Sequence, residues 1–331
     1  MAAVEGVSVN RCARLLRSLA VLAAVGMLAG CGAQAGVPQA TQVSPVGPRP
    51  PDSQPITQST PADGQCGDMT ASLTPTSGAF PPDSTMARIV AKGRLTVGVD
   101  QNTYLFGFRN PSTGQLQGFD IDLAREIARD LFGDPNRIEW RIVTTAERVP
   151  ALTSHQVDLV VRTFSVTCDR LRDIAYSSVY FAAPERILAA RNSGIRTAAD
   201  LAGKRVCVTV GADSADPLFA MHLAQPPTVL GVTNWTDCLV ALQQGQVDAV
   251  STDEPILAGL AAQDPNLQIV GDPLGYENYA VGVPKGQDDM VRFVNGVLSR
   301  IRTDGTWQRL YNQDLTALGP SSGPPAPHYS G

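Results

Sequence analysis

The chain has 331 residues, of which 43% are hydrophobic and 17% are charged. It can therefore bury a sizeable core, and its length favours two domains or lobes over one. The formal net charge of -5 comes without the basic patch that is typical of nucleic-acid-binding proteins, so we exclude nucleic acid as a partner.

The first thirty residues are typical of a secretory signal peptide. Three arginines precede an apolar stretch at residues 18–28 that is too short to span a bilayer. The stretch leads into Leu28-Ala29-Gly30-Cys31, which resembles the lipobox of bacterial lipoproteins. The resemblance implies cleavage before Cys31 and acylation of its sulfur, which would anchor the protein in the outer face of the cell membrane. The alternative is a plain secreted protein in which Cys31 is incidental.

Residues 32–83 are rich in Pro, Gln, Ser, Thr and Gly and have almost no aliphatic periodicity. Such a segment buries too little apolar surface to fold, so we predict that residues 31–83 are the lipidated cysteine and a disordered tether. The folded region begins near Ser84. Residues 319–331 are again rich in Gly, Pro and Ser and are predicted to be a disordered tail.

Helices and strands alternate along the predicted folded region, as in an α/β protein. Strands are predicted at 95–99, 138–143, 157–161, 206–210 and 268–270, and helices at 86–90, 121–132, 149–153, 288–303 and 308–315. Residues 180–191 are predicted to cross between two halves, because Pro184 interrupts an apolar run that resumes at Ile187.

Two ten-residue stretches ninety positions apart share six identical residues. ALTSHQVDLV at 151–160 and ALQQGQVDAV at 241–250 each have the pattern of a helix end that leads into a short strand. Open α/β sheets bind ligands at the carboxyl ends of their strands, so the polar residues after each copy are candidates for a site. Residues 161–170 offer a guanidinium and hydroxyls, and residues 251–255 offer a carboxylate, which together suit an amino acid. A chance likeness of two α/β units is the alternative.

Seven motifs occur in order over residues 84–315. They are LTVGV at 95–99, GFDIDL at 118–123, VDLV at 157–160, Thr167-x-x-Arg170, DLAGK at 200–204, VDAV at 247–250 and GTW at 305–307. The set resembles the polar-amino-acid family of periplasmic-type solute-binding proteins, with the greatest likeness to glutamine- and glutamate-binding lipoproteins. The resemblance implies a type II fold, in which two crossing strands join two α/β lobes and the ligand lies between them. Lobe 1 would be residues 84–183 plus 279–318, and lobe 2 residues 184–278.

The resemblance also implies residue roles. Arg170 would bind the α-carboxylate of the ligand, since a planar guanidinium matches a carboxylate with two parallel hydrogen bonds. Asp253 would bind the α-ammonium group. The other residues expected around the ligand are Thr163, Ser165, Asp213, Ser214, Thr252 and Thr209. The structural alternatives are a solvated helix start for Arg170 and helix caps for the two aspartates.

Side-chain specificity is expected to depend on a second set of residues. Arg162 directly follows a buried strand, where a charge is costly unless it is paired, so it is the best candidate to meet a distal carboxylate, and Arg148 is the other candidate cation. Asp100 occupies a position that faces the distal group of the ligand in similar proteins. Tyr104 is the candidate for an aromatic wall, with a core role as the alternative. The expected ligand is glutamate, aspartate, glutamine or asparagine.

Four cysteines remain once Cys12 leaves with the signal peptide and Cys31 is acylated. An even number in an exported protein predicts disulfides. Three pairings are open, and we favour Cys207 with Cys238, since both should lie in one lobe, which leaves Cys66 with Cys168. Metal binding is disfavoured, because the chain has no Cys-x-x-Cys and no His near these cysteines.

We therefore predict a monomeric, lipid-anchored receptor outside the cell membrane that delivers an amino acid to the permease of an ABC importer and needs no cofactor or metal. One alternative is a receptor that reports its ligand to a membrane sensor protein. A second is an enzyme of the same fold, such as a dehydratase. The enzyme is less favoured, because the chain has no Gly-x-Ser-x-Gly, no metal-ligand cluster and no P-loop.

Overall fold

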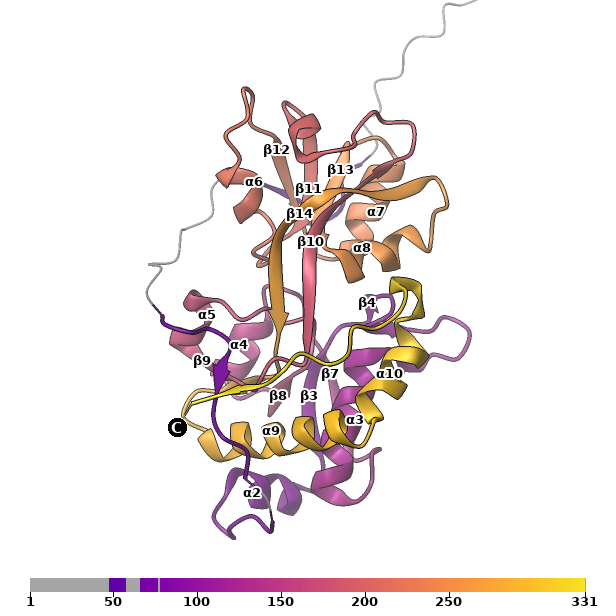
Figure 1. Cartoon of the computed structure of the whole chain (residues 1–331). Helices are drawn as coiled ribbons and strands as arrows, with labels where there is room; N and C mark the ends of the chain where they lie inside the picture. Colours follow the sequence, from indigo (N-terminus) through magenta and orange to yellow (C-terminus); the bar gives the residue numbers. More distant parts are fainter. Residues whose placement is uncertain (1–47, 58–65, 77, 331) are drawn as a thin grey trace, which may run out of the picture. The chain divides into compact units, whose positions relative to one another are not determined.

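Two β-sheets with helices packed against them organise the chain into two lobes (Figure 1). The structure is a computed structural model, and it describes residues 48–57, 66–76 and 78–330, all of which belong to one compact unit, Pro45–Gly331. The predicted signal peptide and Cys31 lie outside the described residues.

Lobe 1 is built on a five-stranded sheet in the order β7-β3-β8-β15-β9. Its strands are β3 (Leu95–Val99), β7 (Ile138–Ile142), β8 (Leu159–Val160), β9 (Ile174–Tyr176) and β15 (Gly282–Pro284). Its helices are α2 (Thr85–Lys92), α3 (Phe119–Phe132), α4 (Arg148–Thr153), α5 (Cys168–Asp173), α9 (Asp288–Thr303), α10 (Thr306–Asp314) and the 3-10 helix η2 (Thr316–Leu318). A small sheet contains β4 (Asn102–Thr103), β5 (Gly107–Arg109) and β6 (Leu116–Gln117). The apolar faces of α3 and α9 form one core with β3.

Lobe 2 is built on a six-stranded sheet in the order β1-β12-β11-β13-β10-β14. Its strands are β1 (Gln54–Ile56), β10 (Phe181–Ala190), β11 (Arg205–Thr209), β12 (Thr228–Val232), β13 (Ala249–Asp253) and β14 (Leu267–Tyr279). Its helices are η1 (Ala198–Leu201), α6 (Asp216–Ala220), α7 (Trp235–Gln243) and α8 (Glu254–Ala261). Two hydrophobic clusters contribute to this core, and one of them packs α7 and α8 against the sheet.

Two long antiparallel strands connect the lobes (Figure 1). β10 coincides with the predicted crossing at 180–191. β14 is longer than predicted, because it continues from Leu267 to Tyr279 with a shift of register opposite Glu185. At the lobe 1 end Phe181 faces Tyr279, and at the lobe 2 end Ala190 faces Leu267.

The two copies of the repeat have the predicted structure. The first joins the end of α4 to β8, and the second joins the end of α7 to β13. The aspartate of each copy also has the same role, because it accepts the backbone N–H of a residue in the neighbouring parallel strand. Asp158 accepts from Thr96 at 2.7 Å, and Asp248 accepts from Arg205 at 2.8 Å. These aspartates therefore fix the start of each strand pair.

The expectation of a disordered tether and tail is wrong for the parts that the structure describes. β1 lies antiparallel to the edge strand β12, with Ile56 packed against Gly231. Farther along, β2 (Ala71–Ser72) pairs in parallel with β16 (His328–Tyr329) of the tail. The tail runs past the crossing strands in Figure 1 and lines a cavity with Phe181 and Pro184 of β10. Both segments owe their order to docking on the folded lobes.

Both favoured disulfides are present. Cys207 of β11 is bonded to Cys238 of α7, and Cys66 is bonded to Cys168 at the start of α5. The first bond holds a helix against its own sheet. The second joins the segment before Ser84 to lobe 1.

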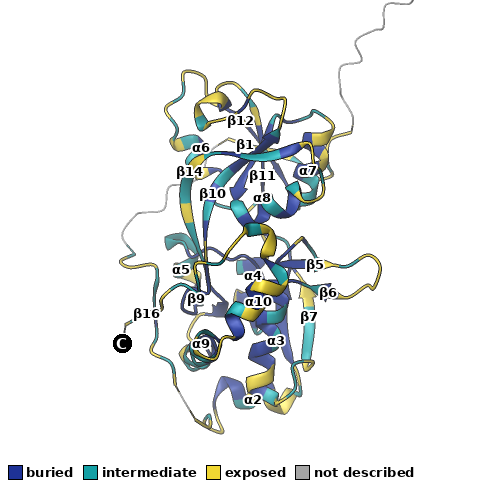
Figure 2. Ribbon diagram, turned by 45° about the vertical axis from the view of Figure 1, so that its right-hand side comes forward, coloured by how far each residue is buried: buried dark blue, intermediate teal, exposed yellow. Residues whose placement is uncertain are grey.

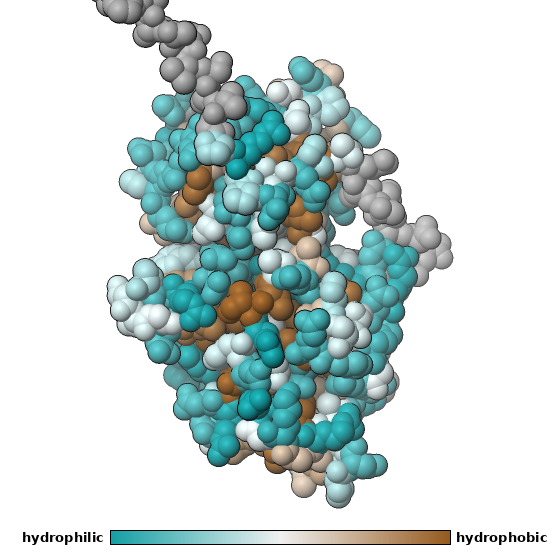
Figure 3. Space-filling model, turned by 180° about the vertical axis from the view of Figure 1, so that it is seen from behind, coloured by the Kyte–Doolittle hydropathy of each residue, from teal (hydrophilic) through white to brown (hydrophobic). Residues whose placement is uncertain are grey.

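Burial follows the two sheets. In Figure 2 the buried residues gather in the strands and in the helix faces that pack on them. The surface seen from behind in Figure 3 is mostly hydrophilic, with apolar residues gathered near its middle. In the described ranges, none of the helices is both long enough and apolar enough to cross a membrane.

Candidate ligand-binding site

A small cavity lies between the lobes, beside the carboxyl ends of their strands. Its volume is about 10 Å³, which leaves room for roughly one water molecule. It is lined by Thr145, Arg148, Arg162, Thr163 and Ser165 of lobe 1 and by Ala212, Asp213, Ser214, Trp235, Thr252, Asp253 and Ile256 of lobe 2. The lobes are therefore closed on each other.

Arg170 of α5 reaches across this closed interface. Its Nη1 donates to the carbonyl of Ser165 at 2.8 Å, and its Nη2 donates to the carbonyl of Gly211 in lobe 2 at 3.0 Å. The same Nη2 lies 3.5 Å from Oδ1 of Asp213. Burial alone would lower the pKa of Arg170, but nearby negative charge, that of Asp213 first, leaves this pKa raised. Arg170 is therefore positively charged.

Arg148 is a buried cation surrounded by carbonyl groups. Its Nε donates to Thr145 O at 2.9 Å, its Nη1 to Thr163 O at 3.2 Å and its Nη2 to Gly211 O at 3.1 Å. Burial, with the charges of Arg170 and Arg162, lowers the pKa of Arg148 to about 9. The environment therefore disfavours this charge in the absence of an added anion.

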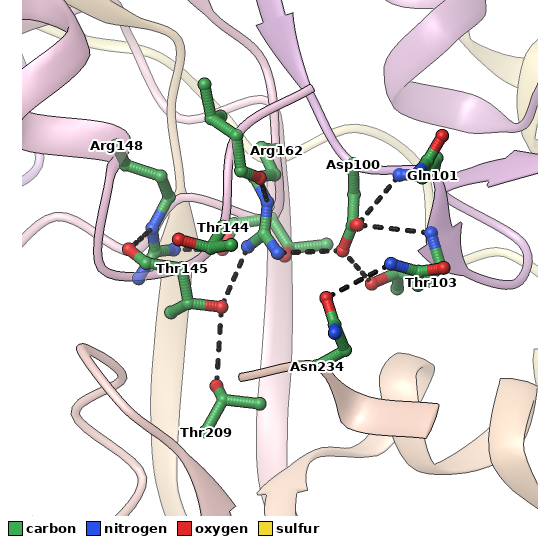
Figure 4. A network of polar contacts seen from close by, with 12 residues as sticks. Asp100, Gln101, Thr103, Thr144, Thr145, Arg148, Arg162, Thr209 and Asn234 are labelled. Atoms are coloured by element: carbon green, nitrogen blue, oxygen red, sulfur yellow. Dashed lines mark hydrogen bonds and ion pairs between the residues drawn. The ribbon is translucent and has the colours of Figure 1, made fainter. Parts of the chain in front are cut away.

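Arg162 has a carboxylate partner within the protein (Figure 4). Its Nη2 lies 2.8 Å from Oδ2 of Asp100, its Nε donates to Val143 O at 2.8 Å and its Nη1 to Thr145 Oγ1 at 3.0 Å. The other oxygen of Asp100 accepts the backbone N–H of Gln101 at 2.7 Å. Two of the residues expected to set specificity, Arg162 and Asp100, therefore form a buried ion pair.

Asp253 is the last residue of β13, and it is buried beside the hydroxyl of Tyr279 and the carboxyl of Glu185. The Tyr279 hydroxyl donates to Oδ2 of Asp253, and Glu185 of β10 lies directly opposite Asp253 in the strand pair. Burial raises the pKa of Asp253 to about 7. Burial, followed by the charge of Asp253, raises the pKa of Glu185 to about 10. Glu185 is thus protonated at neutral pH.

Glu277 of β14 adds a further carboxyl to this cluster. It shares a hydrogen bond with Asp213, and burial together with the charge of Asp213 raises the pKa of Glu277 to about 9. The pKa of Asp213 is lowered, because Arg170 and Arg148 outweigh the effect of burial. Glu277 therefore holds the proton of the pair, and Asp213 carries the charge.

Thr163 has a strained backbone that a buried carboxylate holds in place. Its φ of 36° is in the left-handed region, which is costly for a β-branched residue. Its N–H donates to Oδ2 of Asp120 at 2.8 Å, and Oδ1 of Asp120 accepts from the Tyr180 hydroxyl at 2.6 Å. Asp120 of α3 therefore holds the turn that follows β8 in place.

The remaining predicted residues lie in three different places. Ser214 donates to Thr252 at 3.2 Å within lobe 2, so both lie at the cavity. Thr209 donates to Thr145 at 3.3 Å and so joins lobe 2 to lobe 1 (Figure 4). Tyr104 stays apart: it is 39% exposed, packs on Phe108 and does not line the cavity.

Sequence reasoning missed Asp120, Thr145, Glu185 and Glu277. A signal existed for Glu185, because β10 alternates inward and outward residues and Glu185 falls on the inward side with Ala183 and Ile187. Asp120 stood in a recognised motif without an assigned role. Over the described ranges, no group of three or more His, Cys, Asp or Glu side chains is arranged to hold a metal ion.

Comparisons with known proteins identify the family of the chain. The pattern of the bacterial extracellular solute-binding proteins, family 3, matches residues 95–316. The ABC transporter glutamine-binding protein GlnH of Bacillus subtilis is 34% identical over 230 residues, which cover 69% of this chain and 84% of that protein. The glutamate-binding protein GluB of Corynebacterium glutamicum is 29% identical over 242 residues, which cover 68% and 80%.

Solved structures share the fold. The solute receptor for L-cysteine of Neisseria gonorrhoeae matches with a TM-score of 0.66 and 29% identity, over 70% of this chain and 94% of that chain. The predicted two-lobe fold and the predicted family are thereby confirmed. The chain belongs to the bacterial extracellular solute-binding proteins, family 3.

Proposed function

We propose that this protein binds an acidic or amide amino acid between its lobes and delivers it to the permease of an ABC importer. The names of the similar glutamine- and glutamate-binding proteins support the ligand class. A role in import is supported by the name of the similar Bacillus subtilis protein, which is a glutamine-binding protein of an ABC transporter.

The observation that carries the proposal is that a guanidinium from one lobe and a buried carboxyl from the other lie at the same closed interface. Arg170 comes from lobe 1 and Asp253 from lobe 2, and both lie at the closed interface. An α-carboxylate would replace the carbonyls at Arg170, and an α-ammonium would meet Asp253. Thr163, Ser165 and the amides near Asp213 would share these contacts. Both charges of a zwitterion would then be paired on closure, as burial requires.

The distal group of the ligand is best matched by Arg148. Arg162 is paired with Asp100, whereas Arg148 donates to backbone carbonyls and has two other cations close by. An added carboxylate or carboxamide oxygen would therefore lower the energy of Arg148 more than that of Arg162. A cation at this position favours glutamate or aspartate over their amides.

A thermal-shift screen of the exported protein against the twenty amino acids tests the proposal. A ligand that binds only the folded state raises the melting temperature by mass action, by RT ln(1 + [L]/Kd) in free energy. We expect stabilisation by glutamate, aspartate or their amides. The proposed ligand class is ruled out if none of these four amino acids raises the melting temperature, or if only cationic amino acids do.

The proposal includes anchoring through an acylated Cys31. The support is the sequence Leu28-Ala29-Gly30-Cys31 after an apolar stretch. We expect the Cys31→Ser variant to leave the membrane fraction and to lose palmitate label. A variant that stays in the membrane fraction would refute the anchor while leaving the ligand proposal intact.

A further inference from the structure

Helix α5 carries Arg170 but has little packing of its own. It spans six residues, Cys168–Asp173, and none of them is buried. Isolated helices shorter than about 12 residues are not stable in water, because few hydrogen bonds offset the ordering of the backbone. The orientation of Arg170 therefore depends on contacts from outside the helix.

Several contacts from neighbouring residues hold α5. Thr167 caps it by accepting the N–H of Arg170 at 3.3 Å, and exposed Lys285 donates to the carbonyl of Leu171 at 2.6 Å. The Leu171 side chain packs, partly buried, on the cluster under α4. These contacts are noncovalent and close to solvent. The bond between Cys168 and Cys66 is covalent, so it persists through fluctuations that break the others.

The chain a few residues after Cys66 is attached to the interior of lobe 1 at Ser72 and Leu73. Asn295 of α9 is fully buried, and its Nδ2 donates to Ser72 Oγ at 2.8 Å and to Leu73 O at 2.6 Å. Ser72 in turn donates to the carbonyl of Tyr176 in β9 at 3.0 Å. The segment that follows Cys66 is therefore held by α9 and β9, and the disulfide transmits that fixed position to α5.

We propose that the Cys66–Cys168 disulfide is a positioning device for Arg170, which keeps α5 formed so that the guanidinium is held in place to receive the carboxylate of the ligand. This inference rests on the proposed function. If α5 is formed only a fraction of the time without the disulfide, the apparent dissociation constant rises by the inverse of that fraction. A residual population of about one in ten would therefore weaken binding roughly ten-fold.

The test compares two disulfide-free variants of the exported protein. One carries Cys66→Ser and Cys168→Ser, and the matched control carries Cys207→Ser and Cys238→Ser, which removes the bond between β11 and α7 in lobe 2. We expect the first variant to bind glutamate or glutamine about ten-fold or more weakly and to exchange the backbone amides of 168–173 faster. We expect the control to melt at a lower temperature and to keep the affinity of the wild type within about two-fold.

A second measurement covers the case in which the first variant does not fold. In the folded Cys207→Ser, Cys238→Ser protein, a mild reductant can open only the Cys66–Cys168 bond, and we expect the affinity to fall and to return on reoxidation. Unchanged affinity and unchanged exchange at 168–173 after loss of the bond would overturn the inference. A wild type that binds no amino acid would refute the proposed function instead, while the exchange rates would still decide whether the bond orders α5.

Discussion

His155 and Gly245 occupy matching positions in the two copies of the repeat, and both have a left-handed backbone, with φ of 55° and 67°. In each copy the next residue closes the helix end by donating to the carbonyl of the first alanine, Ala151 or Ala241. The turn is thus the same, but only glycine adopts it without steric cost. His155 is exposed, so its side chain gives little packing in return.

We therefore expect His155→Gly to stabilise the protein by about 0.5–1 kcal/mol, since the left-handed conformation costs other residues about 1–2 kcal/mol and glycine loses part of that gain as chain entropy. Gly245→His is the matched reverse substitution and should destabilise by a similar amount. Urea denaturation of both variants measures the difference. Equal stabilities for His155→Gly and the wild type would contradict this explanation of the turn.

Arg148 allows the ligand preference to be tested at a single residue. Arg148→Gln removes the cation that we propose meets the distal group, and a hydrogen bond to a charged group contributes about 1.5–3 kcal/mol. We expect glutamate to lose roughly 10- to 100-fold more affinity than glutamine, and aspartate more than asparagine, as measured by calorimetric titration. Arg162→Gln serves as the contrast, because it leaves Asp100 buried without its partner and should mainly lower the melting temperature. An unchanged glutamate-to-glutamine ratio in Arg148→Gln would exclude Arg148 as the distal contact.

Glu185 makes stability depend on pH. Its pKa is raised from 4.5 to about 10 in the folded protein, mainly by burial. Between these values the folded state binds a proton that the unfolded chain has released, so the free energy of unfolding falls as pH rises from about 4.5 to about 10. Glu185→Gln removes this contribution and should raise the melting temperature at pH 9 by roughly 3 °C or more, with a smaller change at pH 5. If the melting temperatures of the variant and the wild type differ by the same amount at every pH in this range, Glu185 does not hold the proton.

At the scale of the elements, the hydrogen bonds of Asp158 and Asp248 explain why aspartate occurs at the same position in both copies of the repeat. Asp158 and Asp248 accept backbone N–H groups where β8 and β13 begin, at the ends of the strands opposite to the cavity. We expect Asp158→Ala and Asp248→Ala each to destabilise the protein by about 2 kcal/mol, because a charged acceptor of a backbone N–H is lost. Ligand affinity should stay within two-fold of the wild type. A large loss of affinity with unchanged stability would assign these residues to the site instead.

The elements that the sequence predicts well are those with their own periodicity. α9 has the predicted bounds, and β3 does too, because each buries a clear apolar face against one core. β1, β2 and β16 are two or three residues long and carry no pattern of their own. They form because an edge strand or a partner segment is already in place, which is a tertiary effect that local composition does not encode.

At the scale of the whole molecule, the closed arrangement is held by contacts between the lobes. Arg148 and Arg170 both donate to the carbonyl of Gly211, and Asn102 donates to Asn234 at 3.1 Å. A bound carboxylate would compete with that carbonyl for the two guanidinium groups. On the proposed function, the same cations would serve both closure and ligand binding, and the ligand would act by exchanging these contacts.

The repeat pointed to the cavity between the lobes, because residues that follow both copies line it. The inner partners of the site did not follow from the repeat. Asp100 and Arg162 are 62 positions apart and neutralise each other only once β3 and β8 lie side by side. Glu185 and Glu277 come from the two crossing strands, whose register sets them near Asp253 and Asp213. Such pairings depend on strand register, which single-sequence patterns leave open.

The most direct test of the central claim is calorimetric titration of glutamate, aspartate, glutamine and asparagine into the wild type and into Arg170→Ala and Asp253→Ala, with melting curves as the control for folding. We expect one site per chain in the wild type and a loss of at least about 100-fold in each variant, since a charge pair to the ligand is removed in each case. Folded variants that bind as the wild type does would contradict the claim that an amino acid is held between Arg170 and Asp253.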